Sequence, residues 1–121
     1  MEYPTVSILT PSYNRSKFLP LITFNLLNMD YDKNKLEWCI IDDGKEPLFT
    51  DETLKQTREI LKPIKINYKY ENVKRDIGVK RNALVKMSKY KHCIMMDDDD
   101  VYFPTYIKHS IETLKNNKIG L

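Results

Sequence analysis

Residues 94–100 read Ile-Met-Met-Asp-Asp-Asp-Asp, an apolar run that opens directly into four carboxylates. The apolar part is typical of a buried strand. Four negative charges stay close together and partly dehydrated only when a cation offsets their repulsion. Ligands that are all oxygen select a hard ion such as Mg²⁺ or Mn²⁺, which commonly shares phosphate oxygens of a substrate. A run of like charges is also typical of a solvated loop, so this stretch alone leaves both interpretations open.

The chain is long enough for one domain, residues 1–121, with a core of its own. Its 20 basic and 17 acidic residues are spread along the chain and give a net charge of +3, which does not indicate a nucleic-acid-binding face. Cys39 and Cys93 lie in apolar runs, where thiols usually act as small hydrophobic side chains, and they indicate a reducing compartment. The sequence shows no leader-like start and no stretch of membrane-spanning length. We therefore expect a soluble cytoplasmic domain with no nucleic-acid partner and no membrane segment.

Apolar runs and helical periodicity alternate along the chain. Strands are predicted over residues 6–9, 38–41, 64–70 and 92–96, and helices over residues 18–27, 50–61, 79–87 and 104–117. Strands that alternate with helices favour an α/β fold, with a mainly parallel sheet, helices on both faces and right-handed crossovers. The run 64–70 alternates apolar and polar side chains, as a strand near a sheet edge does.

Single residues predict how the first helix begins and which side chains of the third helix are apolar. Ser16 is predicted to cap the first helix, with Pro20 tolerated in its first turn. Val79, together with Ala83, Leu84 and Met87, is predicted to give the apolar pattern of the third helix.

Polar segments follow three of the predicted strands. They are residues 10–14 (Thr-Pro-Ser-Tyr-Asn), residues 42–43 (Asp-Asp) and residues 97–100. With the strand order 3-2-1-4, the order reverses between the first and fourth strands, and parallel sheets bind ligands at that point, beyond the carboxyl ends. Tyr13 would then lie beside the four aspartates, with Asp43 one strand away. An aromatic face, a carboxylate that accepts hydrogen bonds and a metal site together indicate a nucleoside diphosphate ligand.

The start of the third helix adds a candidate phosphate site. Gly78 precedes Arg81 and Asn82 there, and backbone N–H groups and the helix dipole favour phosphate at such a terminus. Lys80 and Arg81 are expected to complement the anion. Simpler interpretations stay open: a solvated basic turn here, a turn-capping role for Tyr13, and an ordinary strand-ending turn at residues 42–44.

Four segments together resemble the donor-binding half of a family-2-type glycosyltransferase with the GT-A fold. They are residues 6–15 (Val-Ser-Ile-Leu-Thr-Pro-Ser-Tyr-Asn-Arg), 41–44 (Ile-Asp-Asp-Gly), 78–83 (Gly-Val-Lys-Arg-Asn-Ala) and 97–100 with Pro104. The resemblance covers essentially the whole chain. It implies a nucleotide-diphospho-sugar donor, with a UDP-sugar as the leading one, and transfer to an acceptor hydroxyl, usually with inversion. The acceptor, whether glycan, lipid or protein, stays undefined.

The resemblance also assigns roles to individual residues. Pro11 and Tyr13 would line the nucleobase pocket, and Asp43 would hydrogen-bond the base. Residues 97–99 would be the DxD-type motif, in which Asp97 and Asp99 bind Mn²⁺ or Mg²⁺. The other members of the implied nucleotide-sugar site are Ser12, Asn14, Arg15, Asp42, Gly78, Arg81, Asn82, Asp97 and Asp98, the last facing the ribose or sugar.

The sequence departs from the family pattern at two places. Lys-Glu-Pro at residues 45–47 stands where the family commonly has a small hydroxyl residue and another acid. Lys80 stands where a small residue usually precedes the Arg-Asn pair. The family places its acceptor site and catalytic base in a second half, so we expect both beyond Leu121 and name no general base.

Two other functions fit parts of the pattern. Asp97-x-Asp99-x-Val101 after an apolar strand also resembles the nucleophile motif of haloacid-dehalogenase-type phosphatases, although that family carries it on an early strand. A nucleotide-sugar-binding module without activity of its own would need the same binding residues as an enzyme. The sequence therefore predicts donor and metal binding and leaves turnover to be tested.

Overall fold

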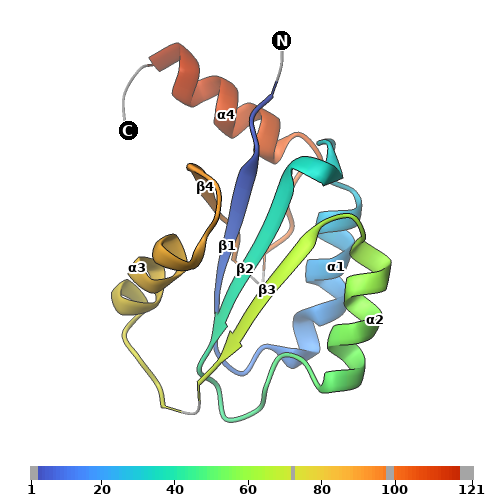
Figure 1. Cartoon of the computed structure of the whole chain (residues 1–121), viewed down its shortest axis with the longest axis vertical. Coiled ribbons are helices and arrows are strands. Elements are labelled where there is room, and N and C mark those ends of the chain that lie inside the picture. Colours follow the sequence, from blue (N-terminus) through green and yellow to red (C-terminus); the bar gives the residue numbers. More distant parts are fainter. Residues whose placement is uncertain (1–2, 72, 98–99, 118–121) are drawn as a thin grey trace.

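The computed structural model describes residues 3–71, 73–97 and 100–117 and contains one parallel sheet between two layers of helices (Figure 1). The strands are β1 (Val6–Ser12), β2 (Leu36–Asp42), β3 (Lys65–Tyr70) and β4 (His92–Met95). Their order is β3-β2-β1-β4, and each neighbouring pair is parallel. The predicted α/β class, the strand order and the edge position of the third strand are confirmed.

Helices cover both faces of the sheet. They are α1 (Leu19–Leu27), α2 (Asp51–Leu61), α3 (Ile77–Met87) and α4 (Tyr106–Asn117), with short 3₁₀ turns at Ser16–Phe18 and Lys33–Lys35. Buried side chains of α1, α2 and α4 share one core, while α3 packs against the opposite face. In Figure 1, α3 lies to the left of the sheet and α1 and α2 lie to its right. Within the described residues, none of the helices combines the length and the apolar character needed to cross a membrane.

The larger core, under α1, α2 and α4, also holds the strand ends together. Ile8, Trp38 and Ile40 point into it from the two central strands and are fully buried. The indole N–H of Trp38 donates to Thr10 Oγ1 at 2.9 Å, and the Thr10 hydroxyl donates to the Met96 carbonyl at 2.8 Å. These two bonds join β1, β2 and the residue that follows β4, so the carboxyl ends of three strands are fixed relative to one another.

The smaller core, under α3, contains Leu9, Cys39, Ile41 and Leu84. Both cysteines of the chain are free thiols. Burial raises the pKa of the Cys39 thiol to about 12, and the nearby Glu37 carboxylate adds to the shift. A thiol with this pKa stays protonated and acts as a small hydrophobic side chain, as predicted.

Pro20 lies in the first turn of α1, and Ala83, Leu84 and Met87 pack against the sheet, as predicted. The predictions for Ser16 and Val79 are wrong. Ser16 does not cap α1, because the chain first makes the 3₁₀ turn and Phe18 becomes the N-cap without a side-chain bond. Val79 is 46% exposed, and Lys80 takes the inward position one turn before Leu84. Apolar periodicity assigns a lysine to the solvent side, so it cannot anticipate a lysine that is buried beside a carboxylate.

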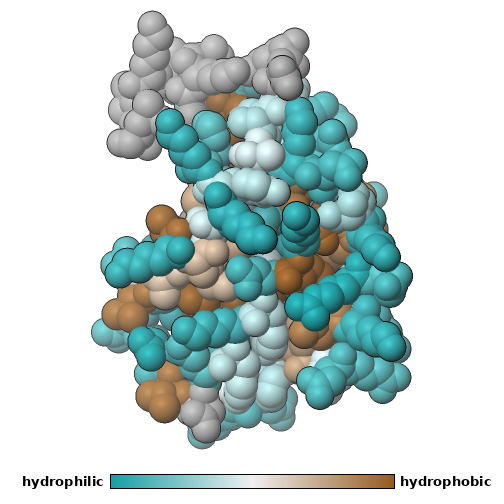
Figure 2. Space-filling view, viewed as in Figure 1, coloured by the Kyte–Doolittle hydropathy of each residue, from teal (hydrophilic) through white to brown (hydrophobic). Residues whose placement is uncertain are grey.

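The outer surface of α3 keeps several apolar side chains in contact with solvent. Ile77, Val79 and Val85 are each about half exposed. Figure 2, in the same view as Figure 1, shows hydrophobic residues in brown among hydrophilic ones in teal on this side of the molecule. The inward face of α3 is therefore narrower and more polar than its sequence suggests.

Candidate functional site

The segments that leave β1, β2 and β4 start at the same edge of the sheet. Ser12 pairs with Asp42 across β1 and β2, and Leu9 pairs with Met95 across β1 and β4. Adjacent strands are about 4.8 Å apart, so β2 and β4 lie about 10 Å apart on either side of β1, and β4 ends three residues earlier than β2 in the register of β1. The structure thus brings Asp43 and Asp97 to one edge, whereas Asp98 and Asp99 lie outside the described residues.

The loops after β1 and β2 approach each other so closely that only glycine fits at position 44. A Cβ on Gly44 would lie 2.4 Å from the backbone nitrogen of Asn14 and 3.2 Å from its Cα. Asn14 has a φ of 53°, a left-handed conformation that asparagine tolerates better than most residues. Its Oδ1 accepts a hydrogen bond from the Glu46 amide at 3.1 Å. The side-chain oxygen of Asn14 therefore fastens the two loops together.

Asp42 is fully buried and organises the loop between β2 and α2. Its Oδ1 accepts from the Gly44 amide at 3.0 Å, and its Oδ2 accepts from the Leu48 amide at 2.6 Å and from the Tyr68 hydroxyl at 2.8 Å. The Tyr70 hydroxyl donates to the Gly44 carbonyl at 2.7 Å. Burial and the bond to Asp42 raise the pKa of Tyr68, so its hydroxyl remains a donor.

Asp43 is also buried, but a cation pairs with it. The ammonium of Lys80 lies 2.8 Å from Oδ1, and the side chains of Lys80 and Asp43 are 6% and 0% exposed. The backbone N–H of Arg75 donates to Oδ2 at 2.6 Å. Burial alone would raise the pKa of Asp43, yet the bonds from Lys80 and Arg75 and the charge of Lys80 hold it below its ordinary value. Asp43 is thus an ionised acceptor inside the protein.

Tyr13 stands beside this pair, at the end of β1. Its ring is half-buried, with the Lys74 ammonium 4.8 Å and the Lys80 ammonium 6.0 Å from the ring centroid. Pro11 and Ser12, which precede it, are buried, and the Ser12 carbonyl accepts from the Asp43 amide at 3.2 Å. Tyr13 therefore offers an aromatic surface at the rim, next to a buried acceptor.

The start of α3 is open to solvent. Gly78, Arg81 and Asn82 are exposed, and a Cβ on Gly78 would meet no atom within 4 Å. Packing therefore does not require glycine at position 78. The expectation that Lys80 would complement an anion here is wrong, because its ammonium is buried against Asp43. Arg15, from the β1 loop, places its guanidinium 5.6 Å from the centre of the Phe18 ring.

Asp97 is exposed where the chain leaves β4. Its amide donates to the Tyr102 hydroxyl at 2.7 Å, and the Tyr102 amide donates to Asn25 Oδ1 at 3.2 Å. Asn25, on α1, in turn donates to the Asp100 carbonyl at 2.7 Å. Burial raises the pKa of Tyr102 to about 12, which keeps its hydroxyl protonated. The backbone that carries Asp97 is thereby anchored to the core on both sides.

This arrangement suits a metal ion that takes some of its ligands from the protein and the others from a substrate. Among the residues that the structure describes, no group of three or more His, Cys, Asp or Glu side chains could hold a metal ion. Mg²⁺ is usually held by one or two carboxylates and by substrate phosphates rather than by a closed protein cage. An exposed carboxylate on an anchored backbone, such as Asp97, fits that donor set.

The sequence gives no signal for some residues of this site and a partial signal for others. Lys80 lies 37 positions from Asp43, and no local pattern connects them. Tyr68 and Tyr70 were predicted as strand residues, and the alternation of β3 does place both on one side, from which they reach the β2 loop. Asn25 and Tyr102 secure the Asp97 loop from 77 positions apart.

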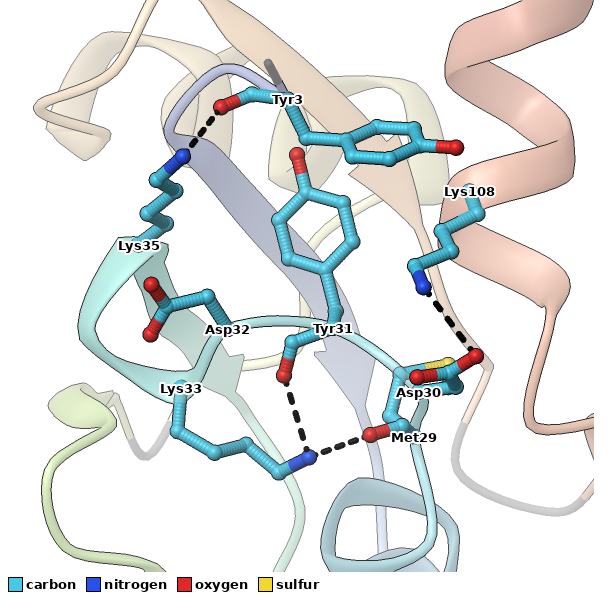
Figure 3. Close-up of a pocket in the computed structure, with 8 residues that line it drawn as sticks. All are labelled: Tyr3, Met29, Asp30, Tyr31, Asp32, Lys33, Lys35 and Lys108. Carbon is cyan, nitrogen blue, oxygen red and sulfur yellow. Dashed lines mark hydrogen bonds and ion pairs between the residues drawn. The ribbon is translucent and has the colours of Figure 1, made fainter. Parts of the chain in front are cut away.

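A different polar hollow, of about 560 Å³, lies where β1 and β2 begin (Figure 3). The residues that line it are Tyr3, Met29, Asp30, Tyr31, Asp32, Lys33, Lys35 and Lys108. Lys33 donates to the Met29 and Tyr31 carbonyls, Lys35 donates to the Tyr3 carbonyl at 2.7 Å, and Lys108 pairs with Asp30 at 3.1 Å. All three ammonium groups are thus used to tie the N-terminal segment, the α1–β2 connection and α4 together.

The family model described as "Glycosyl transferase family 2" matches residues 7–120. The chain belongs to this family. Among curated proteins, it is 32% identical over 111 residues to an uncharacterized glycosyltransferase of Rickettsia prowazekii (strain Madrid E), which covers 92% of this chain and 32% of that protein. It is 26% identical over 127 residues to the cellulose synthase catalytic subunit (UDP-forming) of Pseudomonas fluorescens (strain SBW25), with 99% and 16% covered.

Solved glycosyltransferase structures share the fold. The mannosyltransferase PcManGT from Pyrobaculum calidifontis, in complex with GDP-Man and Mn²⁺, superposes with a TM-score of 0.84 at 17% identity, over 99% of this chain and 35% of that one. TarS 1–349 of S. aureus, in complex with UDP-GlcNAc, gives 0.72 at 21% identity, over 94% and 32%. The GT-A fold expected from the resemblance is confirmed. The chain spans about a third or less of the length of these relatives.

Proposed function

We propose that this chain binds the donor in a glycosyltransferase that moves a sugar from a UDP-sugar to an acceptor hydroxyl with inversion. The observation that carries the proposal is the position of Asp43 and Asp97 at one edge of the sheet, on either side of β1, the strand that Tyr13 follows. A base acceptor and a metal ligand then follow two strands that lie one on each side of β1, at the same end of the sheet. Family membership and the UDP in the names of two relatives support the same donor class.

The base would stack on Tyr13 and donate its ring N–H to Asp43. In the structure, the Lys74 ammonium lies over the Tyr13 ring and the Arg75 amide occupies Oδ2 of Asp43. Base binding at Asp43 therefore requires residues 73–76 to shift, so that one N–H donor replaces another on the same oxygen. Four further residues would shape this pocket, since they are buried or hold its loops together: Pro11, Ser12, Asn14 and Asp42.

The diphosphate would lie between the start of α3 and Asp97. The first turn of an eleven-residue helix presents unpaired N–H groups to an anion, and the missing side chain of Gly78 leaves them accessible. The exposed Arg81 and Asn82 would bind the phosphate oxygens, and Arg15 would add positive charge from the β1 loop. Asp98 would face the ribose or sugar.

A divalent ion would complete the site. Asp97 and Asp99 would hold Mn²⁺ or Mg²⁺, and such an ion offsets the negative charge that builds on a departing nucleoside diphosphate. Tyr102 and Asn25 would keep the backbone of Asp97 in place while its carboxylate turns toward the phosphates. Arg81 would oppose the same negative charge from α3.

Turnover distinguishes an enzyme from a nucleotide-sugar-binding module without activity. A nucleotide-sugar-binding module would bind UDP with Mn²⁺ but neither transfer nor hydrolyse the sugar, whereas an enzyme would lose that activity on Asp99→Ala. The phosphatase interpretation has no support from the family match or from the topology, because Asp97 follows the last strand of the sheet.

Calorimetric titration of UDP into the chain, with and without Mn²⁺, tests donor binding directly. We expect binding that depends on Mn²⁺ and is lost in Asp97→Ala. The matched control is Asp30→Ala, which removes an exposed aspartate from the hollow at the other end of the sheet and should leave binding unchanged. Failure of the folded, unsubstituted chain to bind any nucleotide with Mn²⁺ would overturn the proposal.

A further inference from the structure

Lys80 is a buried cation with a defined set of partners. It is 5% exposed and lies on the inward face of α3, one turn before the fully buried Leu84. Its ammonium contacts Asp43 Oδ1 at 2.8 Å and the Ser12 carbonyl at 3.4 Å. A single ammonium on α3 thus contacts the ends of both β1 and β2. Burying an ammonium is unfavourable unless a carboxylate and further acceptors compensate for the lost water, and here they do.

We propose that Lys80 is a positioning residue for base recognition: it holds Oδ1 of Asp43 and leaves Oδ2 as the oxygen that accepts a hydrogen bond from the base. This inference rests on the proposed function. It assigns Lys80 a role in choosing the nucleotide, through Asp43, without a contact between Lys80 and the base.

The two oxygens of Asp43 differ in how readily their partners can be replaced. The partner of Oδ1 is a buried side chain on a helix that packs against the sheet. The partner of Oδ2 is a backbone N–H from residues 73–76, all of which are exposed. A base N–H can take the place of the Arg75 N–H with no change in the number of hydrogen bonds to Asp43. Oδ2 is therefore the exchangeable acceptor.

An ionised acceptor selects one class of base. Uracil and guanine present a ring N–H beside a carbonyl, whereas cytosine and adenine present an unprotonated ring nitrogen at the matching position. Two acceptors facing each other repel, so an ionised carboxylate discriminates against cytosine and adenine. Lys80 keeps Asp43 in that form, because burial without a cation favours the protonated acid.

Removal of the Lys80 charge would change what Asp43 can recognise. The charged groups around this site in the described residues include Lys80 on α3, Lys74 beside Tyr13, and Asp42, whose oxygens are taken by the β2 loop and Tyr68. The Arg75 side chain, next to the amide that bonds Asp43, pairs with Glu71. Without Lys80, the buried Asp43 has no side-chain cation within hydrogen-bond distance, and its pKa rises. A protonated Asp43 can donate a hydrogen bond to the ring nitrogen of cytosine, which accepts it.

The test compares the affinities for UDP and CDP, with Mn²⁺, at about pH 7.5 and about pH 5.5 in four chains. Lys80→Met removes the charge and keeps much of the length, Lys80→Arg keeps the charge, and Lys86→Met removes an exposed lysine of the same helix. We expect the wild type and Lys86→Met to prefer UDP equally at both pH values. In Lys80→Met the preference should fall at least about tenfold, the effect of one pKa unit on ionisation, and more at low pH. Lys80→Arg, which keeps the positive charge, should keep the wild-type preference for UDP.

Several outcomes overturn the inference. Equal weakening of UDP and CDP in Lys80→Met, with the wild-type pH profile, would make Lys80 a structural residue only. Absence of nucleotide binding by the wild type would instead overturn the proposed function, and the inference with it. If Lys80→Met does not fold, hydrogen exchange in the wild type decides: UDP should expose the Arg75 amide while the Lys80 ammonium stays protected. An Arg75 amide that remains protected with UDP bound would contradict the exchange at Oδ2.

Discussion

The two ends of the sheet both gather lysines and aspartates, but they bury them to different degrees. At the carboxyl end, the side chains of Lys80 and Asp43 are 6% and 0% exposed. At the amino end, those of Lys108 and Asp30 are 32% and 61% exposed. Both pairs have ion-pair geometry, with N–O distances of 2.8 and 3.1 Å. Burial, and not distance, separates the two regions.

This difference has an energetic meaning. An exposed ion pair contributes between zero and about 1 kcal/mol, because water and salt screen it. A buried pair is not needed for stability, since well-packed apolar residues often serve as well, but the loss of one partner leaves a costly unpaired charge. Stability alone therefore does not explain the buried pair at the end of the central strands, and base recognition is the role that we propose for it.

The largest effect should come from breaking the buried pair. Asp43→Ala leaves the Lys80 ammonium inside the protein without its carboxylate, and we expect the free energy of unfolding to fall by about 3 kcal/mol. Urea denaturation of the variant and the wild type measures this directly. A loss below about 1 kcal/mol would show that water reaches Lys80 readily, and the contrast between the two ends of the sheet would disappear.

The contact between the two loops should give the next largest effect. In Gly44→Ala the new Cβ meets the backbone of Asn14, which no side-chain rotation relieves, and we expect a loss of about 2 kcal/mol. Gly78→Ala is the matched control: its Cβ meets nothing, and alanine favours helix, so thermal stability should stay the same or rise by up to about 1 kcal/mol. Equal losses in both variants would argue against the close approach at Gly44. A selective loss of UDP affinity in Gly78→Ala would support a phosphate at the start of α3.

The hydrogen bond between Tyr68 and Asp42 should contribute less. Tyr68→Phe removes one of three donors to a buried carboxylate, and we expect a loss of about 1.5 kcal/mol in chemical denaturation. Tyr70→Phe removes a bond to the Gly44 carbonyl from a partly exposed hydroxyl, and should cost about 0.5 kcal/mol. The reverse order would mean that Tyr70, rather than Tyr68, fixes the β2 loop.

The smallest effect should come from the amino end. Asp30→Asn breaks the pair with Lys108, and we expect a change in unfolding free energy of at most about 0.5 kcal/mol that vanishes at high salt. Melting curves at low and high ionic strength measure it. A loss comparable to that of Asp43→Ala would contradict the claim that burial makes the Lys80–Asp43 pair the costlier one to break.

Periodicity was enough to predict the fold, and strand-end chemistry predicts a site at the carboxyl ends of the strands, where the structure brings Asp43 and Asp97. The apolar run at 6–9 agrees with the central place of β1 and the alternation at 64–70 with the edge place of β3, and the order of elements limits the topology. The same rules failed for Lys80, because they assign each residue to a face by its polarity alone. They also gave no sign of the hollow around Tyr3 and Tyr31, whose contacts join segments distant in sequence. Pairings made only in the folded chain leave no local pattern.

Paramagnetic broadening by Mn²⁺ in the presence of UDP tests the central claim most directly, because it reports which end of the sheet holds the ion. We expect the amide signals of Asp97, Tyr102 and Tyr13 to broaden and those of Tyr31 and Lys33, at the opposite end, to stay sharp. Broadening centred on Tyr31 and Lys33, or broadening that does not depend on UDP, would contradict a metal and nucleotide site at the carboxyl ends of the strands.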